Sequence, residues 1–392
     1  MTLRTFIFWP HLVAGLLAGS IILLMSATGV LLTYERQLIA WSDSDLRSTP
    51  PADGHALMQV ESLLAALRRD EPALQVSALT LASDATAPVV IVSGQRTLYA
   101  DAYTGRVLGE TSQGVRRFMA RVRAWHRWLA VEGEGRPVAR AVTGWSNAIF
   151  LFIVASGTYL WFPRRWTWPR VRPVLMFNGG LHGKARDFNW HNVIGAWSAV
   201  PLFIVVLTAM PISFPWANAL VYRAVGEEPP AQGGRGGREG GPAGSRQDAP
   251  EGAHRLDALF STAARHSPGW KTINLRMPAS ADAPVVFAID RGDGGQPQLR
   301  STLSLDRTTG AVVASESFSD QSLGRRLRSI SRFAHTGEVL GLAGQTIAGL
   351  ATAGSVVLVW TGIALAVRRC LAWIGRRKRQ SESIDSRSAS AA

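Results

Sequence analysis

Four of the eight histidines stand at the entrance of long apolar runs. They occur as His11 in "WPHLVAG", His126 in "AWHRWL", His191 in "NWHNVIG" and His335 in "FAHTGEV". A single histidine at the start of a helix is more often a polar interface residue or a cap. Four in equivalent positions favour a shared chemistry, because imidazole is a good axial ligand for haem iron and ionisable groups at membrane depth are usually functional.

The apolar runs are long enough to cross a bilayer. Hydrophobic residues make up 47% of the 392 residues, and no Asp, Glu, Lys or Arg occurs in 12–34, 141–162, 192–222 or 339–367. About 20 apolar residues cross a hydrocarbon core of roughly 30 Å. The first run exceeds the apolar core of a secretory signal and no small-x-small site follows it before Glu35, so we expect it to be retained. We predict transmembrane helices at 9–34, 138–162, 189–216 and 335–367.

The charges between these helices predict an orientation. The segment 163–188 carries six Lys or Arg against one Asp, and the tail 368–392 is also basic. Short cationic loops stay in the cytoplasm. We therefore expect 163–188 to be a cytoplasmic loop, both termini to be cytoplasmic, and the two long intervening segments to lie outside. The net charge of +14 is then a topology feature, and no folded nucleic-acid-binding motif accompanies it.

The two long segments read as copies of one small α+β domain. In 50–112, a helical pattern precedes the strand-like "QVSALTL" and "APVVIVSG", and a hairpin containing "TG" follows. The region 253–320 repeats this order with "KTINLRM", "APVVFAID" and a second "TG" hairpin. The Gly- and Pro-rich 226–252 is predicted to be a disordered linker. The predicted fold class is an α-helical membrane protein, a four-transmembrane-helix bundle with two external α+β modules.

Helix direction sorts the four histidines by depth. His11 and His191 begin helices that start inside, whereas His126 and His335 lie where helices start outside. Two imidazoles facing each other across a bundle can hold a haem, so one haem is expected near each face.

Small residues accompany the inner pair. Gly15 and Gly195 stand four residues after His11 and His191, on the same helix face, where a flat macrocycle needs a small side chain. Close helix packing explains these glycines equally well.

The remaining metal-binding residue types narrow the chemistry. Cys370 is the only cysteine, which excludes a C-x-x-C-H attachment, a cysteine-ligated iron–sulfur cluster and a disulfide within the chain. Any haem would be non-covalent, as in a b-type centre. His182, nine residues before His191, is a reserve ligand for the inner pair. The other three histidines are expected on the surface of the external segments: His55, His254 and His266.

These motifs resemble the PepSY-associated transmembrane family of bacterial inner-membrane proteins, in particular its ferric-siderophore reductases. The resemblance covers nearly the whole chain and is carried by the four histidine contexts, by "SGTYLWFPRR" and by the hairpins "YADAYTGRVLG" and "LSLDRTTGAVV". It implies two periplasmic PepSY-like modules and two b-type haems. It also implies electron transfer from the cytoplasmic side to a ferric siderophore in the periplasm, with release of Fe(II).

Further expectations concern the surroundings of the haems. Haem propionates favour cationic neighbours, and Arg164 inside and Arg332 outside are candidates, although snorkelling explains them too. The chain lacks a G-x-G-x-x-G dinucleotide unit, so electrons must come from a partner or a small donor such as a quinol. Pro201 is expected to kink the third transmembrane helix, which could open a crevice for a quinol.

Two other functions fit parts of the sequence. A haem-free PepSY membrane protein could bind or regulate a periplasmic partner such as a protease, and the histidines would then be coincidental. A permease is the weaker alternative, because four helices leave little room for a path and no carboxylate lies within the apolar runs.

Overall fold

The computed structural model describes residues 2–52, 57–163, 165–230, 255–278, 280 and 283–390, with side chains as far as Arg377. The chain forms two compact units. The first, called here the helical unit, comprises Met1–Tyr34, Ala120–Asn218 and Ala334–Ala392. The second, the sheet unit, comprises Glu35–Met119 and Ala219–Phe333, so both long intervening segments of the sequence belong to one unit.

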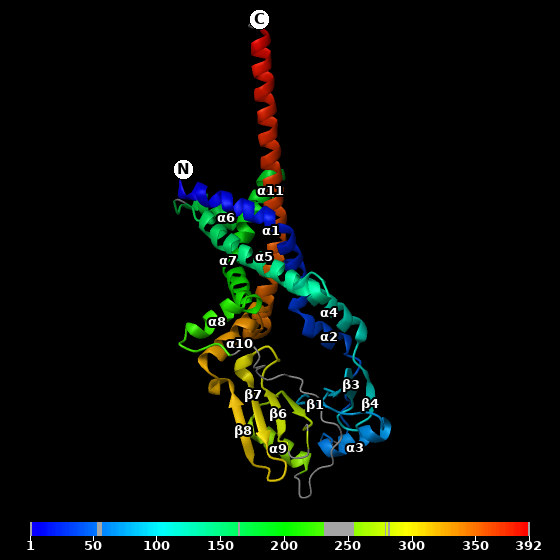
Figure 1. Ribbon diagram of the computed structural model, residues 1–392. Coiled ribbons are helices and arrows are strands. Elements are labelled where there is room, and N and C mark those ends of the chain that lie inside the picture. Colours follow the sequence, from blue (N-terminus) through cyan, green and yellow to red (C-terminus); the bar gives the residue numbers. More distant parts are fainter. Residues whose placement is uncertain are drawn as a thin grey trace. The chain divides into compact units, whose positions relative to one another are not determined.

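Four long apolar helices build the helical unit (Figure 1). They are α1 (Leu3–Thr33), α5 (Arg136–Trp161), α7 (Gly183–Ser213) and α11 (Gly341–Ser390). Each is long and apolar enough to cross a membrane, as predicted for the four apolar runs. α1 and α7 each pack against both α5 and α11, so the four helices form a closed bundle.

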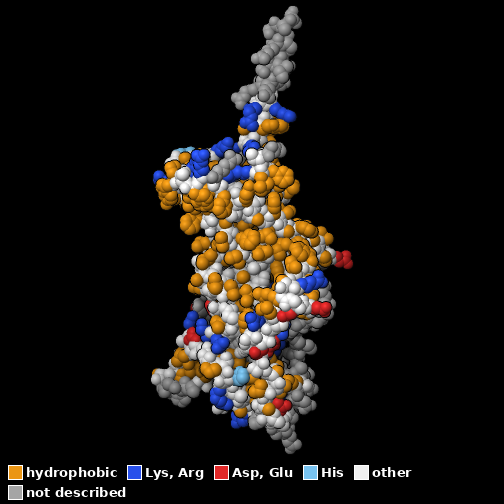
Figure 2. Space-filling model, turned by 90° about the vertical axis from the view of Figure 1, so that its left-hand side faces the viewer, with side chains coloured by type: hydrophobic (Ala, Val, Ile, Leu, Met, Phe, Trp, Pro, Cys, Tyr) orange, Lys and Arg blue, Asp and Glu red, His pale blue; other side chains and the backbone are white. Residues whose placement is uncertain are grey.

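The outer surface of the bundle is apolar. Large hydrophobic side chains such as Leu17, Val200 and Leu350 are 70–75% exposed. On the face that Figure 2 shows, hydrophobic side chains cover most of the helical unit, and Lys and Arg gather at one end of it. Exposed apolar surface of this extent indicates a lipid-facing protein.

Several helix limits differ from the predicted ones. The first and third spans begin six residues earlier than expected, at Leu3 and Gly183. The fourth span was expected to begin at His335 and end at 367, but α11 begins at Gly341 and continues through the predicted tail to Ser390. Arg, Lys, Gln and Glu are good helix formers, and the basic tail 368–392 contains no proline. The helix therefore continues beyond the residue where the charges begin. The predicted loop 163–188 contains a short helix, α6 (Trp168–Leu175), and the first turns of α7.

Further short helices flank the spans. They are α2 (Glu35–Ser42), α4 (Gln113–Trp128), α8 (Pro215–Arg223), α10 (Leu323–His335) and the 3₁₀ turns η1 (Gly133–Gly135), η2 (Pro297–Leu299), η3 (Phe318–Asp320) and η4 (Glu338–Leu340).

In the described residues of the sheet unit, eight strands form one antiparallel sheet in the order β4-β3-β2-β1-β5-β6-β7-β8. Each predicted module supplies four strands after one helix. The first is α3 (Val60–Asp70) with β1 (Ala78–Ala82), β2 (Val89–Ser93), β3 (Arg96–Ala100) and β4 (Val107–Glu110). The second is α9 (Leu256–His266) with β5 (Thr272–Arg276), β6 (Val285–Asp290), β7 (Arg300–Leu305) and β8 (Val312–Ser317). The modules join edge to edge, with Leu79 opposite Leu275.

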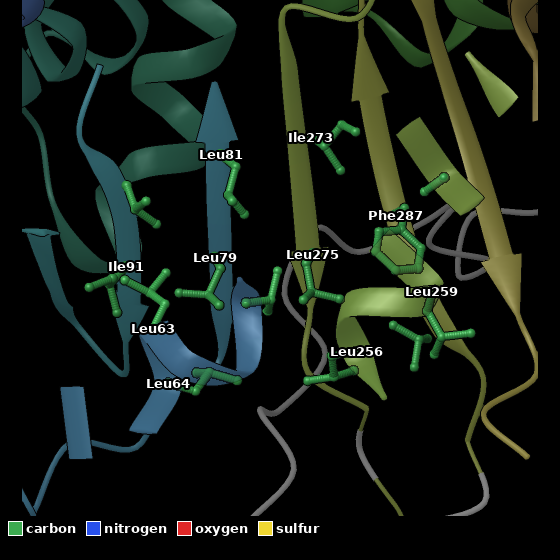
Figure 3. Packing of buried hydrophobic residues seen from close by; sticks show 14 of the residues in the cluster. Leu63, Leu64, Leu79, Leu81, Ile91, Leu256, Leu259, Ile273, Leu275 and Phe287 are labelled. Carbon is green, nitrogen blue, oxygen red and sulfur yellow. The ribbon is translucent and has the colours of Figure 1, made fainter. Parts of the chain in front are cut away.

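One hydrophobic core runs across the junction of the two modules. The inward residues of the strands alternate with partly exposed ones and pack under both helices. Figure 3 shows Leu63 of α3 and Leu259 of α9 over strand residues such as Leu79, Leu275 and Phe287. The helix starts also cap each other, because Leu256 N donates to Glu61 Oε1 (2.8 Å) and Glu61 N donates to Asp257 Oδ1 (3.2 Å).

The closing hairpins of the two modules, β3–β4 and β7–β8, contain the same type of turn. Asp101 accepts hydrogen bonds from the N–H groups of Tyr103 and Thr104, and Gly105 follows at φ +73°. Asp306 accepts from Thr308 and Thr309 in the same way, before Gly310 at φ +71°. The left-handed conformation explains why both predicted turns contain glycine.

We expect Asp101→Asn to destabilise the sheet unit by about 1–3 kcal/mol, since Asp101 is buried and holds several donors. Burial alone would raise its pKa, but the N–H groups of Thr104, Thr49 and Tyr103 hold it below the usual value. The contribution is therefore present above about pH 4, the unfolded value, and is lost as the pH falls through the folded pKa. Urea unfolding at pH 7 and pH 3 checks this: the difference between wild type and variant should shrink at pH 3.

Candidate functional site

The four histidines of the apolar runs all belong to the helical unit. His11 lies on α1, His191 on α7 and His126 near the end of α4. His335 is the last residue of α10, a helix separate from α11. Gly337 (φ +75°) and η4 turn the chain between these two helices. The prediction that His335 opens the fourth span is therefore wrong in its detail: it closes the preceding helix.

The imidazoles of His126 and His335 face one another. Their ring centres lie 6.4 Å apart and their planes are inclined by 45°. An imidazole nitrogen binds a transition metal at about 2 Å, so two imidazoles on opposite sides of one metal ion have ring centres roughly 6 Å apart. The spacing in this pair suits one axially bound ion between the rings.

Both imidazoles of this pair are neutral near pH 7. Burial, together with the neighbouring His335, lowers the pKa of His126 to about 4. Burial also lowers the pKa of His335. A neutral ring keeps one nitrogen lone pair, which is the form that binds a metal.

His11 and His191 form a second pair. The two imidazoles lie close enough to interact electrostatically. His182, the reserve candidate, is exposed at the N-cap of α7, nine residues or about two and a half turns before His191. The structure thus brings His191, not His182, to His11.

Each of the four rings is held through Nδ1 by a neighbouring long helix. His11 Nδ1 lies 2.8 Å from Ser156 Oγ, and His191 Nδ1 lies 3.0 Å from Thr361 Oγ1. His126 Nδ1 lies 3.0 Å from Thr28 Oγ1, and His335 Nδ1 lies 2.8 Å from the Val205 carbonyl.

The acceptors decide which nitrogen carries the proton. Val205 O and Met25 O, the latter 3.0 Å from His126 Nδ1, are carbonyls and can only accept. The hydroxyls of Ser156 and Thr361 donate to carbonyls of their own helices, at 2.7 and 2.8 Å, and so offer lone pairs to the rings. Nδ1 is therefore the protonated nitrogen, and Nε2 holds the lone pair. Metal-binding histidines are oriented in this way by their second nitrogen.

A glycine follows each of the three hydroxyl residues and lies against the ring, most tightly at Gly157. A Cβ at Gly157 would lie 3.1 Å from His11 Cε1, one at Gly362 3.4 Å from His191 Cε1, and one at Gly29 3.5 Å from His126 Cε1. The sequence reading missed these Ser/Thr-Gly pairs and proposed Gly15 and Gly195. A Cβ at Gly15 would meet nothing within 4 Å, and one at Gly195 meets only Leu358 Cδ2 at 3.7 Å.

The two halves of the chain repeat the same arrangement of elements and histidine contacts. Each half of the chain contains a histidine-bearing span, a four-stranded module, a helix ending near a second histidine, and another span. In each half, the histidine of the first span bonds a Ser or Thr on the second, and the later histidine bonds the first span. Each of the two pairs combines one histidine from each half. A comparison of the two halves was the signal that could have revealed the hydroxyl partners.

A family model described as the PepSY-associated TM region matches residues 8–369. The chain belongs to this family. No curated protein matches the chain. The matched region includes the whole sheet unit, most of the helical unit and all four paired histidines, so this PepSY-associated membrane protein carries its candidate site inside the family region.

The structure says less about the other sequence candidates of this family member. Arg164 lies outside the described residues, as do His55, His254 and the stretch 231–252 of the expected linker. Arg332 is exposed one turn before His335, with its guanidinium 5.4 Å from the ring centre of Phe333. His266 is exposed on the sheet unit, as expected. Among the described residues, no group of three or more His, Cys, Asp or Glu side chains could hold a metal ion.

Proposed function

We propose that this protein is a di-haem b oxidoreductase of the bacterial inner membrane. In this proposal it carries electrons from the cytoplasmic face to a ferric siderophore in the periplasm, and the iron leaves as Fe(II). The observation that carries the proposal is the set of four imidazoles in two pairs, each with Nδ1 hydrogen-bonded and Nε2 free to donate a lone pair.

These residues fit haem better than a bare metal ion. A haem iron takes four ligands from its macrocycle and needs two more, which is what a pair of histidines supplies. When bound, haem accepts and releases single electrons. His11 with His191 would hold one haem and His126 with His335 the other, and the Ser/Thr hydroxyls and carbonyls would keep each ring in its binding tautomer.

The charges support the proposed direction. The basic segment 163–188 would lie in the cytoplasm by the positive-inside rule, near the start of α1 and α7. His11 and His191 would then serve the cytoplasmic side, and the sheet unit would lie in the periplasm. Two haems stacked in one bundle divide a crossing of roughly 30 Å into shorter steps.

Reduction would release the iron because hard oxygen ligands prefer the trivalent ion. No described observation favours the haem-free, partner-binding alternative. That alternative does not explain why all four imidazoles are held through Nδ1 with Nε2 left free. The ordered Nδ1 contacts are the reason to prefer the redox role.

Transmembrane electron transfer tests the proposal. Vesicles containing the protein would enclose dithionite, with a ferric trihydroxamate chelate and a chromogenic Fe(II) trap outside. We expect Fe(II) to appear outside at a rate proportional to the protein content. Equal rates in protein-free vesicles, or in vesicles containing His335→Ala protein, would contradict the proposed function.

Thr361→Val should weaken the inner haem site. The change keeps the side-chain shape and removes the acceptor of His191 Nδ1, and losses of this kind typically reduce metal affinity by about 10–100-fold. Titration of the apoprotein with haem, followed by absorption, measures the affinity. Thr158→Val is the matched control, because within the described part of the chain the Thr158 hydroxyl bonds only its own helix, at Val154 O (2.8 Å). Equal affinities of the two variants would refute the assigned role of Thr361.

A further inference from the structure

A groove opens where the start of α1 meets the end of α5. Its lining residues are Thr2, Leu3, Arg4, Tyr159 and Phe162, and its volume is about 320 Å³. That volume lies at the lower end of the roughly 300–1,000 Å³ of small-molecule sites. Leu3, Tyr159 and Phe162 are 62%, 44% and 48% exposed, so the groove is open at the surface of the helical unit.

Arg4 fixes the two helices at this place. Its guanidinium donates to Phe162 O at 3.2 Å and to Leu160 O. These carbonyls end α5 and lack partners within the helix, so the arginine completes the helix end. The Tyr159 hydroxyl has no hydrogen bond within the described part of the chain, and it remains available to a ligand.

The groove is close to the His11–His191 pair along the helices. Arg4 stands seven residues before His11, about 10 Å along the helix axis. Tyr159 stands three residues after Ser156, the partner of His11, which is about one turn. A ligand in the groove would therefore lie one to two turns from the imidazole of His11.

The second half of the chain does not repeat the residues that line the groove. Lys184 precedes His191 by the same seven residues, but Ala364 follows Thr361 where Tyr159 follows Ser156, and Val367 replaces Phe162. At that end, Arg368 is instead paired with the buried Asp187 at 3.0 Å. The histidine pairs use both halves equally, whereas the groove belongs to one. This difference suits a task that needs a single site, such as electron entry.

We propose that this groove binds a membrane hydroquinone, which is the electron donor. The inference rests on the proposed di-haem function. An isoprenoid hydroquinone has an apolar tail that would enter from the lipid, a ring that suits Leu3, Tyr159 and Phe162, and hydroxyls that can bond the Tyr159 hydroxyl and Arg4. Dissolved in the bilayer, it can reach an exposed groove on the bundle.

The oxidation is balanced with the proposed carriers. The two O–H bonds of the hydroquinone break, the ring becomes the quinone, and two protons leave to water at that face. The two electrons would pass one at a time to the ferric haem that His11 and His191 would hold, and the first would move on to the second haem before the next arrives. The Tyr159 hydroxyl accepts a hydrogen bond from the substrate hydroxyl and so positions it.

Two measurements on the detergent-purified holoprotein test the inference. Photolabelling with an azido-ubiquinone, followed by peptide mapping, should mark residues 1–8 and 159–163. Stopped-flow mixing with decylubiquinol should reduce the haem, and Tyr159→Phe and Arg4→Gln should each slow this reaction at least tenfold. Both variants should keep the wild-type absorption spectrum after dithionite reduction. Lys184→Gln, the equivalent change in the other half, should react like the wild type.

The outcomes separate the two proposals. Haem that dithionite reduces but decylubiquinol does not would overturn the inference and leave the di-haem function intact. Labelling abolished by phospholipid but not by unlabelled quinone would identify a lipid site and also overturn it. A haem-free protein would refute the proposed function. Photolabelling does not require haem, so it would still show whether the groove binds a quinone. Equal slowing by Lys184→Gln would assign the effect to general surface charge and contradict the inference.

Discussion

His335→Ala is expected to leave the protein with one haem per chain instead of two. The substitution removes one of the two imidazoles that face each other at 6.4 Å, while the His11–His191 pair uses other residues of the bundle. Haem content per protein by the pyridine haemochrome method measures the loss. Electron transfer across vesicles should fall by at least 100-fold, because the step to the external side loses its carrier.

His266→Ala is the control for this prediction. His266 is an exposed histidine of the sheet unit that bonds Ser315 Oγ at 3.0 Å, so the variant should keep two haems. Retention of two haems by His335→Ala would show that His335 is not a ligand. Loss of both haems with a normal unfolding midpoint would show that the two pairs are not independent sites.

The second large effect is expected at Gly337. This residue has φ +75°, and an added Cβ would lie 2.5 Å from Gly344 O and 2.8 Å from Ala348 Cβ. The turn between α10 and α11 thus has no room for a side chain. Gly337→Val should destabilise the protein by roughly 2–4 kcal/mol through left-handed strain and overpacking.

The same substitution should also disturb the nearby histidine. Because Gly337 follows His335 by two residues, the distorted turn would shift the imidazole and weaken the haem there. Thermal unfolding in detergent and haem content together measure both effects. Gly375→Ala is the control, since a Cβ there would meet nothing within 4 Å. A Gly337→Val protein with wild-type stability and two haems would contradict the described turn.

Much of the architecture could be predicted from the sequence. The four charge-free runs are each long enough to span a bilayer. The helix of each module can be told from its strands, because burial of one face gives a period of 3.6 residues in a helix and of two residues in a strand. The repeated "TG" hairpins are also local, since a left-handed position requires glycine. The joining of the modules through β1 and β5 was missed. Pairing between distant edge strands depends on backbone hydrogen bonds, which leave no mark in the residue pattern.

The grouping of the four histidines into two pairs was predicted from the sequence, but the hydrogen-bond partners of their rings were missed. A histidine at the entrance of an apolar run is conspicuous, whereas Ser156 or Thr361 within such a run resembles any hydroxyl bonded to its own helix. Only the fold brings these hydroxyls to the rings. The position of His335 was misjudged because Gly337 and Gly341 were read as part of an apolar span, although their positive φ angles end one helix and start another.

The most direct test of the central claim is the absorption spectrum of the detergent-purified wild-type protein, oxidised and then dithionite-reduced, with haem per chain determined as the pyridine haemochrome. The account predicts a Soret band, sharp reduced α and β bands, and two b-type haems per chain. A protein that remains colourless after expression with ample haem would contradict it.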